Sequence, residues 1–323
     1  MPERVSVALC THNGERHLGE QLRSVLAQTR RVDEIVLSDD ASTDRTRVIL
    51  EEFRASAPAG IRVIVLHNDP ALGVTANFEK AVRATSGDVV FLCDQDDVWA
   101  TDKVDRLLRS LDEHHATLVH SDARIVDADG TPTGETLFGT LGVRPSDLAA
   151  EERGDAARVL LRRNIVTGAT VALRRSLAEA VMPFPASWLH DEWLAMSAAL
   201  RGGLVVSRLP LTDYRIHGQN QIGASRLTAA AALGRLRASR ADRNARLLAR
   251  AQDLYDRVAA DRPDDRAVLA VLHDKLRHEQ VRSAYPRARA LRILPVLREL
   301  ATGRYGRFGG GLRDVLRDLV QPV

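Results

Sequence analysis

The chain has 323 residues with 45% hydrophobic and 28% charged side chains, a composition that is typical of a soluble globular protein and excludes a disordered or fibrous one. Only two cysteines are present, and neither a signal-peptide pattern nor a run of about 18 apolar residues occurs, so we expect buried free thiols, a cytoplasmic location and no transmembrane helix. Residues 1–225 carry 25 basic against 32 acidic side chains, a net charge of −7, whereas residues 226–323 carry 21 against 11, a net charge of +10, so the two parts face different surroundings.

Short β-branched runs alternate with segments of helical periodicity through the first third of the chain. Strands are expected at 5–10, 34–40, 61–68 and 88–94, and helices at 17–29, 46–53, 74–85 and 103–115. Such alternation predicts a mainly parallel sheet covered by helices on both faces, which binds its ligands at the carboxyl ends of the strands. Polar side chains follow the strands at these ends: Thr11 and Asn13, then Asp39 and Asp40, then Asp94, Asp96 and Asp97.

The rest of the pattern is less regular. Residues 131–155 are rich in Gly, Pro and Asp and predict a loop over the site. Further strands are expected at 116–130, 167–175 and from 203 onward, with helices at 156–163, 176–184 and 187–203. After residue 225, segments rich in Ala, Leu and Arg predict three or four helices, with breaks near Pro263, Pro286 and Gly309-Gly310-Gly311.

The stretch FLCDQDDVW, residues 91–99, places three carboxylates within four positions directly after an apolar run. Like charges this close raise one another's pKa. Either the triplet lies on a solvated turn in which Asp97 caps a helix, or a hard cation such as Mg²⁺ or Mn²⁺ compensates the charge and keeps coordination positions for phosphate oxygens. The residues alone leave both interpretations open.

Seven stretches carry the candidate functional residues: VALCTHNGERHLGEQLRSVLAQT, EIVLSDDASTDRT, NDPALGVTANFEKAV, GDVVFLCDQDDVWATDK, GATVALRR, HDEW at 190–193 and YRIHGQN at 214–220. In this order and spacing they resemble glycosyltransferase family 2 enzymes with the GT-A fold, especially the rhamnosyltransferase-like members. The resemblance spans about residues 4–222. It implies an α/β fold of GT-A type, with a mainly parallel, Rossmann-like sheet flanked by helices and a helical C-terminal appendage. We expect residues 1–115 to be the nucleotide-sugar-binding half of this domain, 116–222 its acceptor-binding half, and 223–323 a basic helical region.

The resemblance also implies how the donor's phosphates are held. Asp94-Gln95-Asp96 is similar to the family's Asp-x-Asp element, in which Asp96 would bind the Mg²⁺ or Mn²⁺ that bridges the two phosphates. Asp94 would contact the ribose or a metal-bound water. In YRIHGQN, Arg215 would pair with phosphate, and His217 would be either a further metal ligand or a phosphate donor.

The nucleotide itself would meet the ends of the first two strands. By the resemblance, Thr11 and Asn13 match the loop that lies against the nucleotide. Asp39 and Asp40 match an acidic pair in which one carboxylate accepts the pyrimidine N3–H while the other caps the following helix. The sequence leaves open which acid has which role, and an N-terminal capping cluster is the alternative for both.

The motif HDEW carries the expected general base. The resemblance implies an acid at a helix start below the sugar's anomeric carbon, and Asp191 fits this place, with Glu192 as the alternative because many members have Glu-Asp where this chain has His-Asp-Glu. The base would take the proton from the acceptor hydroxyl, and direct displacement would invert the anomeric centre. The alternative is that Asp191 only caps the helix. Nearby tryptophans either stack on sugar or pack in the core: Trp99, Trp188 and Trp193.

Three classes of function compete. The leading hypothesis is a metal-dependent, inverting glycosyltransferase that moves a sugar from dTDP-L-rhamnose, or from a UDP-linked sugar, to a growing surface glycan or a lipid-linked precursor. The alternative is a nucleotide-sugar-binding subunit without catalysis, which the intact set of Asp94, Asp96 and Asp191 disfavours. A dinucleotide-dependent oxidoreductase is disfavoured because CTHNGERHLG lacks the G-x-G-x-x-G pattern.

The basic C-terminal region allows two interpretations. Segments 234–250 and 289–308 are amphipathic and rich in Arg, so they would either rest peripherally on the anionic inner face of the plasma membrane or form a helical appendage that packs on the catalytic domain or makes a homodimer. Nucleic-acid binding is not expected, because no recognised module accompanies the charge.

Overall fold

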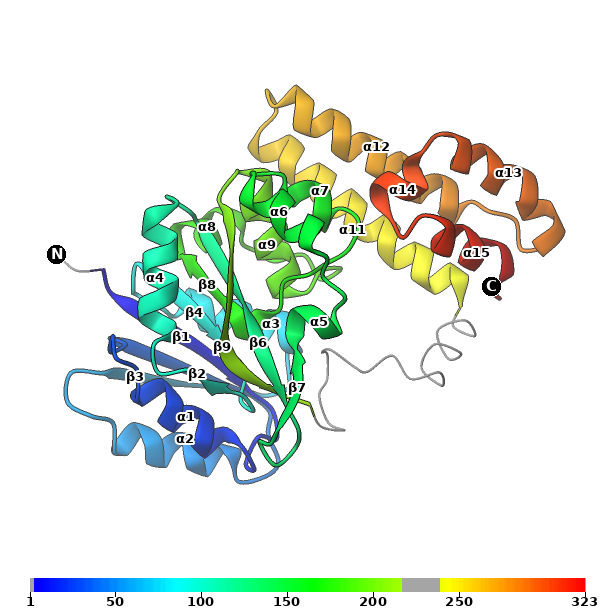
Figure 1. Ribbon diagram of the computed structural model, residues 1–323. Coiled ribbons are helices and arrows are strands. Elements are labelled where there is room, and N and C mark those ends of the chain that lie inside the picture. Colours follow the sequence, from blue (N-terminus) through cyan, green and yellow to red (C-terminus); the bar gives the residue numbers. More distant parts are fainter. Residues whose placement is uncertain (1–2, 217–238, 323) are drawn as a thin grey trace. The chain divides into compact units, whose positions relative to one another are not determined.

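The computed structural model describes residues 3–216 and 239–322, and the chain separates into two compact units (Figure 1). The sheet unit comprises residues 1–156 and 165–225, and the helical unit comprises residues 157–164 and 226–323. The chain therefore enters the helical unit twice, first for a short segment and then for its C-terminal part. The sequence offered no signal that the segment 157–164 belongs with the C-terminal helices.

One nine-stranded sheet runs through the sheet unit in the order β3-β2-β1-β4-β8-β6-β9-β5, with β7 paired to β6. The strands are β1 (Val5–Thr11), β2 (Glu34–Asp40), β3 (Arg62–Asn68), β4 (Val89–Cys93), β5 (Val98–Trp99), β6 (Leu118–Val126), β7 (Pro132–Thr136), β8 (Val171–Arg174) and β9 (Leu204–Arg215). The strands predicted in the first third of the chain agree with these bounds to within a residue or so.

The sheet is parallel in its first half and mixed in its second. β1 pairs in parallel with β2 and β4, and β2 with β3. β8 then runs antiparallel to both β4 and β6, whereas β9 is parallel to β6. The alternation of strands and helices did not predict that β8 runs antiparallel to its neighbours. β8 follows irregular segments rather than a crossover helix like those of the first half.

Helices cover both faces of this sheet (Figure 1). One face carries α1 (Leu18–Leu26), α2 (Thr46–Ala55) and α4 (Lys103–Glu113). The other carries α3 (Val74–Arg83), α8 (Arg175–Val181) and α9 (His190–Leu200). This arrangement confirms the predicted α/β architecture with helices on both faces.

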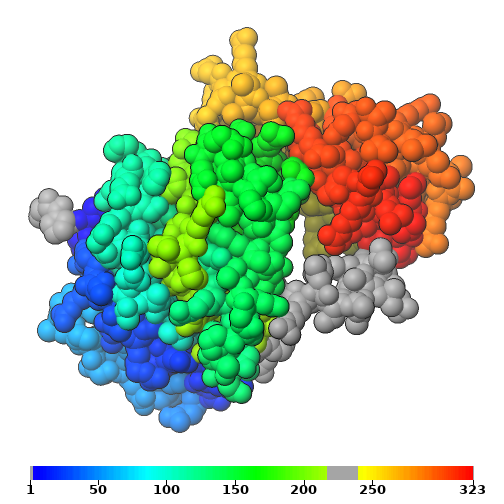
Figure 2. All heavy atoms as spheres, in the orientation of Figure 1, coloured from blue at the N-terminus to red at the C-terminus, as the bar shows by residue number. Residues whose placement is uncertain are grey.

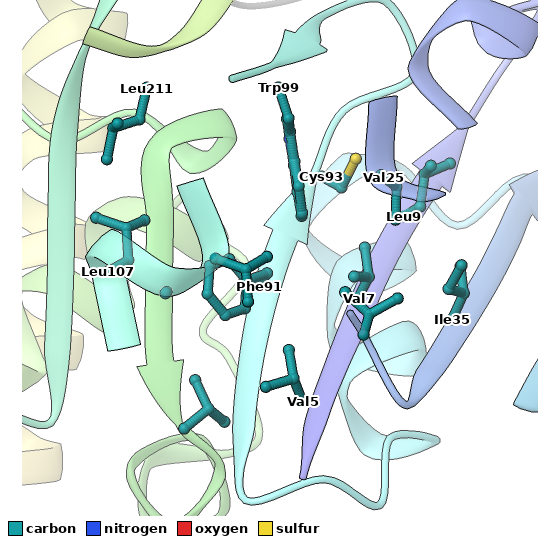
Figure 3. Packing of buried hydrophobic residues seen from close by; sticks show 14 of the residues in the cluster. Val5, Val7, Leu9, Val25, Ile35, Phe91, Cys93, Trp99, Leu107 and Leu211 are labelled. Atoms are coloured by element: carbon teal, nitrogen blue, oxygen red, sulfur yellow. The ribbon is translucent and has the colours of Figure 1, made fainter. Parts of the chain in front are cut away.

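The core on the first face follows from the two-residue period of a strand. Val5, Val7 and Leu9 alternate along β1, are fully buried and point into the same layer (Figure 3). Phe91 of β4 continues this layer and lies 5.7 Å from the ring of Trp99, centroid to centroid. Burial of apolar surface stabilises the folded state by about 25 cal/mol per Å². This packed layer therefore holds β1 and β4 in place, and with them the strand ends that carry the polar residues.

The segment 131–155 is ordered secondary structure, so the predicted loop over the site is wrong. It contains β7, α5 (Leu137–Thr140) and α6 (Pro145–Glu152). Thr136 Oγ1 accepts the N–H of Gly139 and caps α5, and Pro145 occupies the first turn of α6. The turn-forming residues of this stretch therefore mark the boundaries of short elements.

The helical unit contains most of α7 (Ala156–Leu160), together with α11 (Arg240–Asp261), α12 (Arg266–Ser283), α13 (Arg289–Ala301), α14 (Arg304–Phe308) and α15 (Leu312–Val320). The predicted breaks near Pro263, Pro286 and Gly309-Gly310-Gly311 are confirmed. One break was missed: Gly303, with φ 77°, separates α13 from α14. Figure 2 shows atoms of α13 to α15, coloured orange to red, at the surface. Among residues 3–216 and 239–322, no helix is long and apolar enough to cross a membrane.

Buried arginines hold the helical unit together. Arg282 is 1% exposed and donates to Asp318 at 2.7 Å and to Glu279 at 3.0 Å. Tyr305 also donates to Asp318, at 2.8 Å. Arg292 is equally buried and donates to backbone carbonyls. Part of the charge that the sequence suggested was at the surface is therefore internal.

Candidate active site

Strands β1, β2 and β4 end side by side and bring the predicted polar residues to one edge of the sheet. In the parallel register Thr11 lies opposite Asp39, and Leu9 lies opposite Cys93, the residue before Asp94. Asp40 pairs with the last residue of β3. The polar residues predicted at these strand ends therefore share one edge.

Asp39 is fully buried and saturated with donors. Its Oδ1 accepts the hydroxyl of Thr11 at 3.1 Å, and its Oδ2 accepts Arg47 Nε at 2.8 Å and the N–H of Ser42 at 3.1 Å. Burial alone would raise the pKa of Asp39, but the donors, Ser42 first, outweigh it and lower the pKa below its usual value. Asp39 is thus an ionised group that caps the turn after β2.

Asp40 fixes a different segment, the turn before α3. Its Oδ1 accepts Asn68 Nδ2 at 2.8 Å and the N–H of Leu72 at 2.7 Å, and its Oδ2 accepts the N–H of Gly73 at 2.9 Å. Both acids of the pair therefore hold backbone turns around the strand ends. That Asp39 or Asp40 accepts the N3–H of the pyrimidine stays a prediction. In either residue, that hydrogen bond would go to a carboxylate oxygen that already accepts another one.

Asn13 closes the loop after β1 on to the loop after β2. It adopts a left-handed conformation with φ 50°, which asparagine tolerates better than most residues. Its N–H donates to Ser42 Oγ at 2.9 Å, and its Oδ1 accepts the N–H of Thr43 at 2.8 Å. Gly14 adds a bond from its N–H to Thr46 Oγ1 at 2.8 Å.

Gln95, to which the sequence assigned no role, locks the acidic triplet to this loop. Its Oε1 accepts the N–H of His12 at 2.8 Å, and its Nε2 donates to the carbonyl of His12 at 3.0 Å. A Cβ placed on Gly14 would lie 2.2 Å from Gln95 Oε1, so any larger residue there would displace the Gln95 side chain. The middle residue of the Asp-x-Asp element thereby sets the position of the two acids beside it.

One of the three acids of the triplet is buried. Asp94 and Asp96 are partly exposed, whereas Asp97 is 2% exposed. Asp97 Oδ1 accepts the N–H of Arg215 at 3.0 Å, and its Oδ2 is buried without a hydrogen bond. Burial, followed by the charges of Asp96 and Asp191, raises the pKa of Asp94 to about 7, and burial also raises the pKa of Asp97 well above its usual range. The burial of Asp97 disfavours a solvated turn for this residue.

A buried lysine lies beside the triplet. Lys103 is fully buried, and its Nζ donates to Ala169 O at 2.6 Å and Thr212 Oγ1 at 2.9 Å and lies 4.2 Å from the ring centroid of Trp99. Burial lowers the pKa of Lys103 to about 8, although the nearby Cys93, Asp97 and Asp94 act in the opposite direction. Sequence reasoning missed this cation, because a lysine at a helix start is ordinarily exposed; its only signal was its place directly after the acidic motif.

Asp191 lies in the first turn of α9, as predicted. Its Oδ2 accepts the N–H of Gly168 at 2.8 Å, and its Oδ1 accepts the N–H of Glu192 at 2.7 Å. A Cβ on Gly168 would lie 3.0 Å from His190 Nε2, so the chain approaches closely there. His190 stacks on Phe78 at 3.8 Å between ring centroids, and burial lowers its pKa to about 3, so it is a neutral packing residue.

Asp191 and the segment after the acidic triplet are linked through Gly168 and Ala169. Tyr214 is 5% exposed, and its pKa is raised by burial and then by the charges of Asp97, Asp94, Asp96 and Asp191. Two hydrogen bonds make this link. Asp191 accepts the N–H of Gly168, and the carbonyl of the next residue, Ala169, accepts Lys103 Nζ. The general-base candidate is therefore linked through residues 168 and 169 to the helix that follows the Asp-x-Asp element, and a shared site stays a prediction.

Arg215 has protein partners at the same site. Its guanidinium is 2% exposed and donates to the carbonyl of Asp96 at 2.8 Å, to the carbonyl of Ala128 at 3.2 Å and to Glu20 at 2.8 Å. It thus orients the backbone of the triplet, and its contact with phosphate remains a prediction. His217 lies outside the described residues.

The three tryptophans belong to the core. Trp99, Trp188 and Trp193 are 3%, 6% and 1% exposed, and the last two contact each other edge to face. Trp193 Nε1 also donates to the carbonyl of Val181 at 3.0 Å. Their burial favours the packing alternative over sugar stacking.

The metal ion stays a prediction. Across residues 3–216 and 239–322, no three His, Cys, Asp or Glu side chains come together as a ready-made metal site. The buried Asp97 Oδ2, which has no hydrogen bond, is nevertheless the type of oxygen donor that Mg²⁺ or Mn²⁺ accepts. A cation here would take other ligands from a bound donor or from outside the described residues.

Comparison with known families agrees with this geometry. Residues 6–180, more than half of the chain, match the sequence profile described as Glycosyl transferase family 2. The chain belongs to glycosyltransferase family 2. The resemblance inferred from the motifs is therefore confirmed at the level of the family.

Among relatives, the family 2 chain is 30% identical over 224 residues to an uncharacterised glycosyltransferase of Nostoc, covering 67% of this chain and 66% of the relative, just under two thirds of its length. It is 26% identical over 227 residues to the dTDP-rhamnosyl transferase RfbG of Shigella flexneri, covering 67% of this chain and 74% of RfbG. The structure of S. aureus TarS 1–349 in complex with UDP-GlcNAc superposes with a TM-score of 0.57 at 18% identity, covering 98% of this chain and 89% of that one. The last similarity confirms the GT-A-type fold.

Proposed function

We propose that this family 2 chain transfers a sugar from a nucleotide-sugar to a hydroxyl of a glycan or lipid-linked acceptor in cell-surface polysaccharide synthesis, with inversion at the anomeric carbon. One observation carries the proposal: Asp191 accepts the N–H of Gly168, and the carbonyl of the next residue, Ala169, accepts Lys103 Nζ from the helix that follows the Asp-x-Asp element. A donor held by Asp94 and Asp96 would thus present its sugar within reach of Asp191.

Asp191 would serve as the general base. Its place in the first turn of α9 favours the carboxylate form, because the N-terminus of a helix stabilises negative charge. The carboxylate would take the proton of the acceptor hydroxyl as that oxygen forms its bond to the anomeric carbon. The bond between that carbon and the diphosphate breaks, and the diphosphate leaves with the electron pair. Attack from the side opposite the leaving group gives inversion.

The donor's phosphates would lie at the triplet. When bound, Mg²⁺ or Mn²⁺ would neutralise charge that develops on the leaving diphosphate. Asp96 would hold it, with His217 as a further ligand, and Asp94 would contact the ribose or a metal-bound water. Gln95 and Arg215 would keep these acids in position through the bonds they make to the backbone.

The donor proposed first is dTDP-L-rhamnose. The motif resemblance favours it, and the Shigella relative is named for dTDP-rhamnosyl transfer. A UDP-linked sugar is the alternative, supported by the UDP-GlcNAc complex of the structural neighbour. A thermal-shift screen of both classes with Mn²⁺, and with a chelator, would separate them, because a ligand that binds the native state raises the unfolding temperature.

The catalytic assignment is tested with Asp191→Asn against Glu192→Gln as the matched control. We expect Asp191→Asn to lower turnover by about 10²–10⁴-fold, with donor affinity within twofold of the wild type, and Glu192→Gln to retain most activity. If only Glu192→Gln loses activity, Glu192 and not Asp191 is the general base. Donor binding by the wild type with no transfer to any acceptor tried, and no hydrolysis, would instead favour a non-catalytic binding subunit.

A further inference from the structure

Exposed apolar side chains concentrate on two helices of the helical unit. Of the ten large hydrophobic residues that are exposed in the described chain, seven lie in α13 and α15. They are Leu291, Ile293, Leu294, Leu297, Leu312, Leu316 and Val320, with exposed fractions from 42% to 74%. Scattered exposed leucines are ordinary, but this concentration on neighbouring helices marks an interaction surface.

The positions on each helix show that these side chains form outward faces. In α13, Leu291, Leu294 and Leu297 repeat every three residues, whereas Arg292 and Val296 face inward and are buried. In α15 the exposed residues Leu312, Leu316 and Val320 repeat every four. The inner faces pack on each other, because Val296 and Val315 belong to the same buried cluster. We call the two exposed stripes the α13/α15 face.

The charge around the α13/α15 face has one sign. Residues 286–322 contain eight arginines and three acids. Glu299 and Asp318 are buried, and Asp314 is bonded to the N–H of Gly310 and to Arg317. The exposed arginines are Arg287, Arg289, Arg298, Arg307 and Arg313. Arg307 is paired with Asp274 of α12 at 2.9 Å, so Arg287, Arg289, Arg298 and Arg313 supply the exposed positive charge near the apolar stripes.

We propose that the α13/α15 face docks on an anionic lipid bilayer. Leucines that enter the headgroup boundary, with arginines that meet acidic lipid headgroups, are the features of an interfacial helix surface. A second copy of the chain is the weaker occupant, because it would bring the same arginines into contact with their like. Docking would hold the protein at the surface of an anionic membrane, whichever sugar it transfers. In this proposal the contact lies on α13 and α15 rather than on the 234–250 segment.

Vesicle flotation of the full chain tests this proposal. We expect the chain to float with vesicles that contain phosphatidylglycerol and to stay in solution with phosphatidylcholine alone. Arg298→Gln combined with Arg313→Gln removes two charges near the surface and should weaken binding about 30-fold. Leu294→Gln combined with Leu316→Gln removes apolar contacts and should weaken it about tenfold or more.

Matched controls change similar residues elsewhere. Arg246→Gln with Arg277→Gln removes two exposed arginines from α11 and α12, and Val48→Gln with Leu209→Gln removes two exposed apolar residues from the sheet unit. Both pairs should bind vesicles within twofold of the wild type. Circular dichroism of every variant checks that the helices remain folded.

Two results would overturn the proposal. The first is absence of binding to anionic vesicles, or binding that the controls weaken as much as the α13/α15 variants do. The second is a dimer, seen by light scattering, that Leu294→Gln with Leu316→Gln dissociates while vesicle binding is absent; this assigns the face to a second copy. Donor binding is measured in the same proteins without lipid, so a failure here leaves the transferase proposal untouched.

Discussion

Replacement of Lys103 by methionine tests whether a buried cation holds the acidic end of β4 in place. The side chains have similar volume, so the change removes the charge and two hydrogen bonds with little loss of packing. The acceptors left behind are Ala169 O, now 2.6 Å from Nζ, and Thr212 Oγ1, at 2.9 Å. Each buried acceptor without a donor costs about 1–3 kcal/mol.

The nearby carboxylates add to this cost, because the charge of Lys103 opposes the burial that raises the pKa of Asp94 and Asp97. Methionine also relieves the burial penalty that lowers the pKa of Lys103 to about 8, which offsets part of the loss. We therefore expect Lys103→Met to lower the free energy of unfolding by about 3 kcal/mol at pH 7.

Urea unfolding followed by tryptophan fluorescence measures this, since all three tryptophans lie in the sheet unit. Arg109→Met on the same helix removes only an exposed ion pair with Asp105, so the control should stay within about 0.5 kcal/mol of the wild type. A double-mutant cycle with Asp97→Asn should show coupling, the double variant losing less than the sum of the single ones. Stability of Lys103→Met equal to that of Arg109→Met would refute the compensating role.

Gly14→Ala should weaken donor binding and cost about 1–3 kcal/mol of stability, because its Cβ would displace the Gln95 amide from its two hydrogen bonds. Gly19→Ala in α1, where the nearest atom is Arg23 Nη1 at an ordinary contact distance of 3.6 Å from the new Cβ, should instead stabilise by about 0.5–1 kcal/mol; calorimetry checks both. Stability should also fall in acid. Burial would raise the pKa of Glu279, but two neighbouring cations outweigh this effect and lower the pKa. The contribution of Glu279 to the free energy of unfolding is therefore present above about pH 4.5 and is lost as the pH falls through the lowered pKa. Far-ultraviolet circular dichroism between pH 6 and pH 3 should show this loss in the wild type and a flatter profile in Glu279→Gln; identical profiles would contradict it.

The strand ends could be predicted because periodicity and polarity change at the same positions. Apolar alternation located β1, β2 and β4, and a parallel register then brings Thr11, Asp39 and Asp94 to one edge. Asp191 was located by its motif at a helix start. These predictions rely on patterns within about ten residues of the site residue itself.

The missed features depend on partners distant in sequence. Lys103 is buried because Ala169 and Thr212, 66 and 109 residues away, supply its acceptors, and no local pattern shows this. The same applies to Arg282 and Asp318, whose pairing takes charge out of the predicted basic surface. Segment 131–155 was misread for another reason, since the residues that form turns also start and end short helices.

The segment 157–164 belongs to the helical unit but is synthesised long before the other helices of that unit, which has a consequence for folding during synthesis. Val159, Leu160 and Leu161 are buried, and they belong with helices that are made at the end of the chain. At about 5–20 residues per second, a ribosome needs roughly 10–30 s to translate from this segment to the last helix. Until then these three apolar side chains belong to a unit that is incomplete. A nascent chain stalled before α15 should therefore be a substrate for chaperones, and a deletion after residue 225 should yield an aggregating fragment rather than a minimal enzyme.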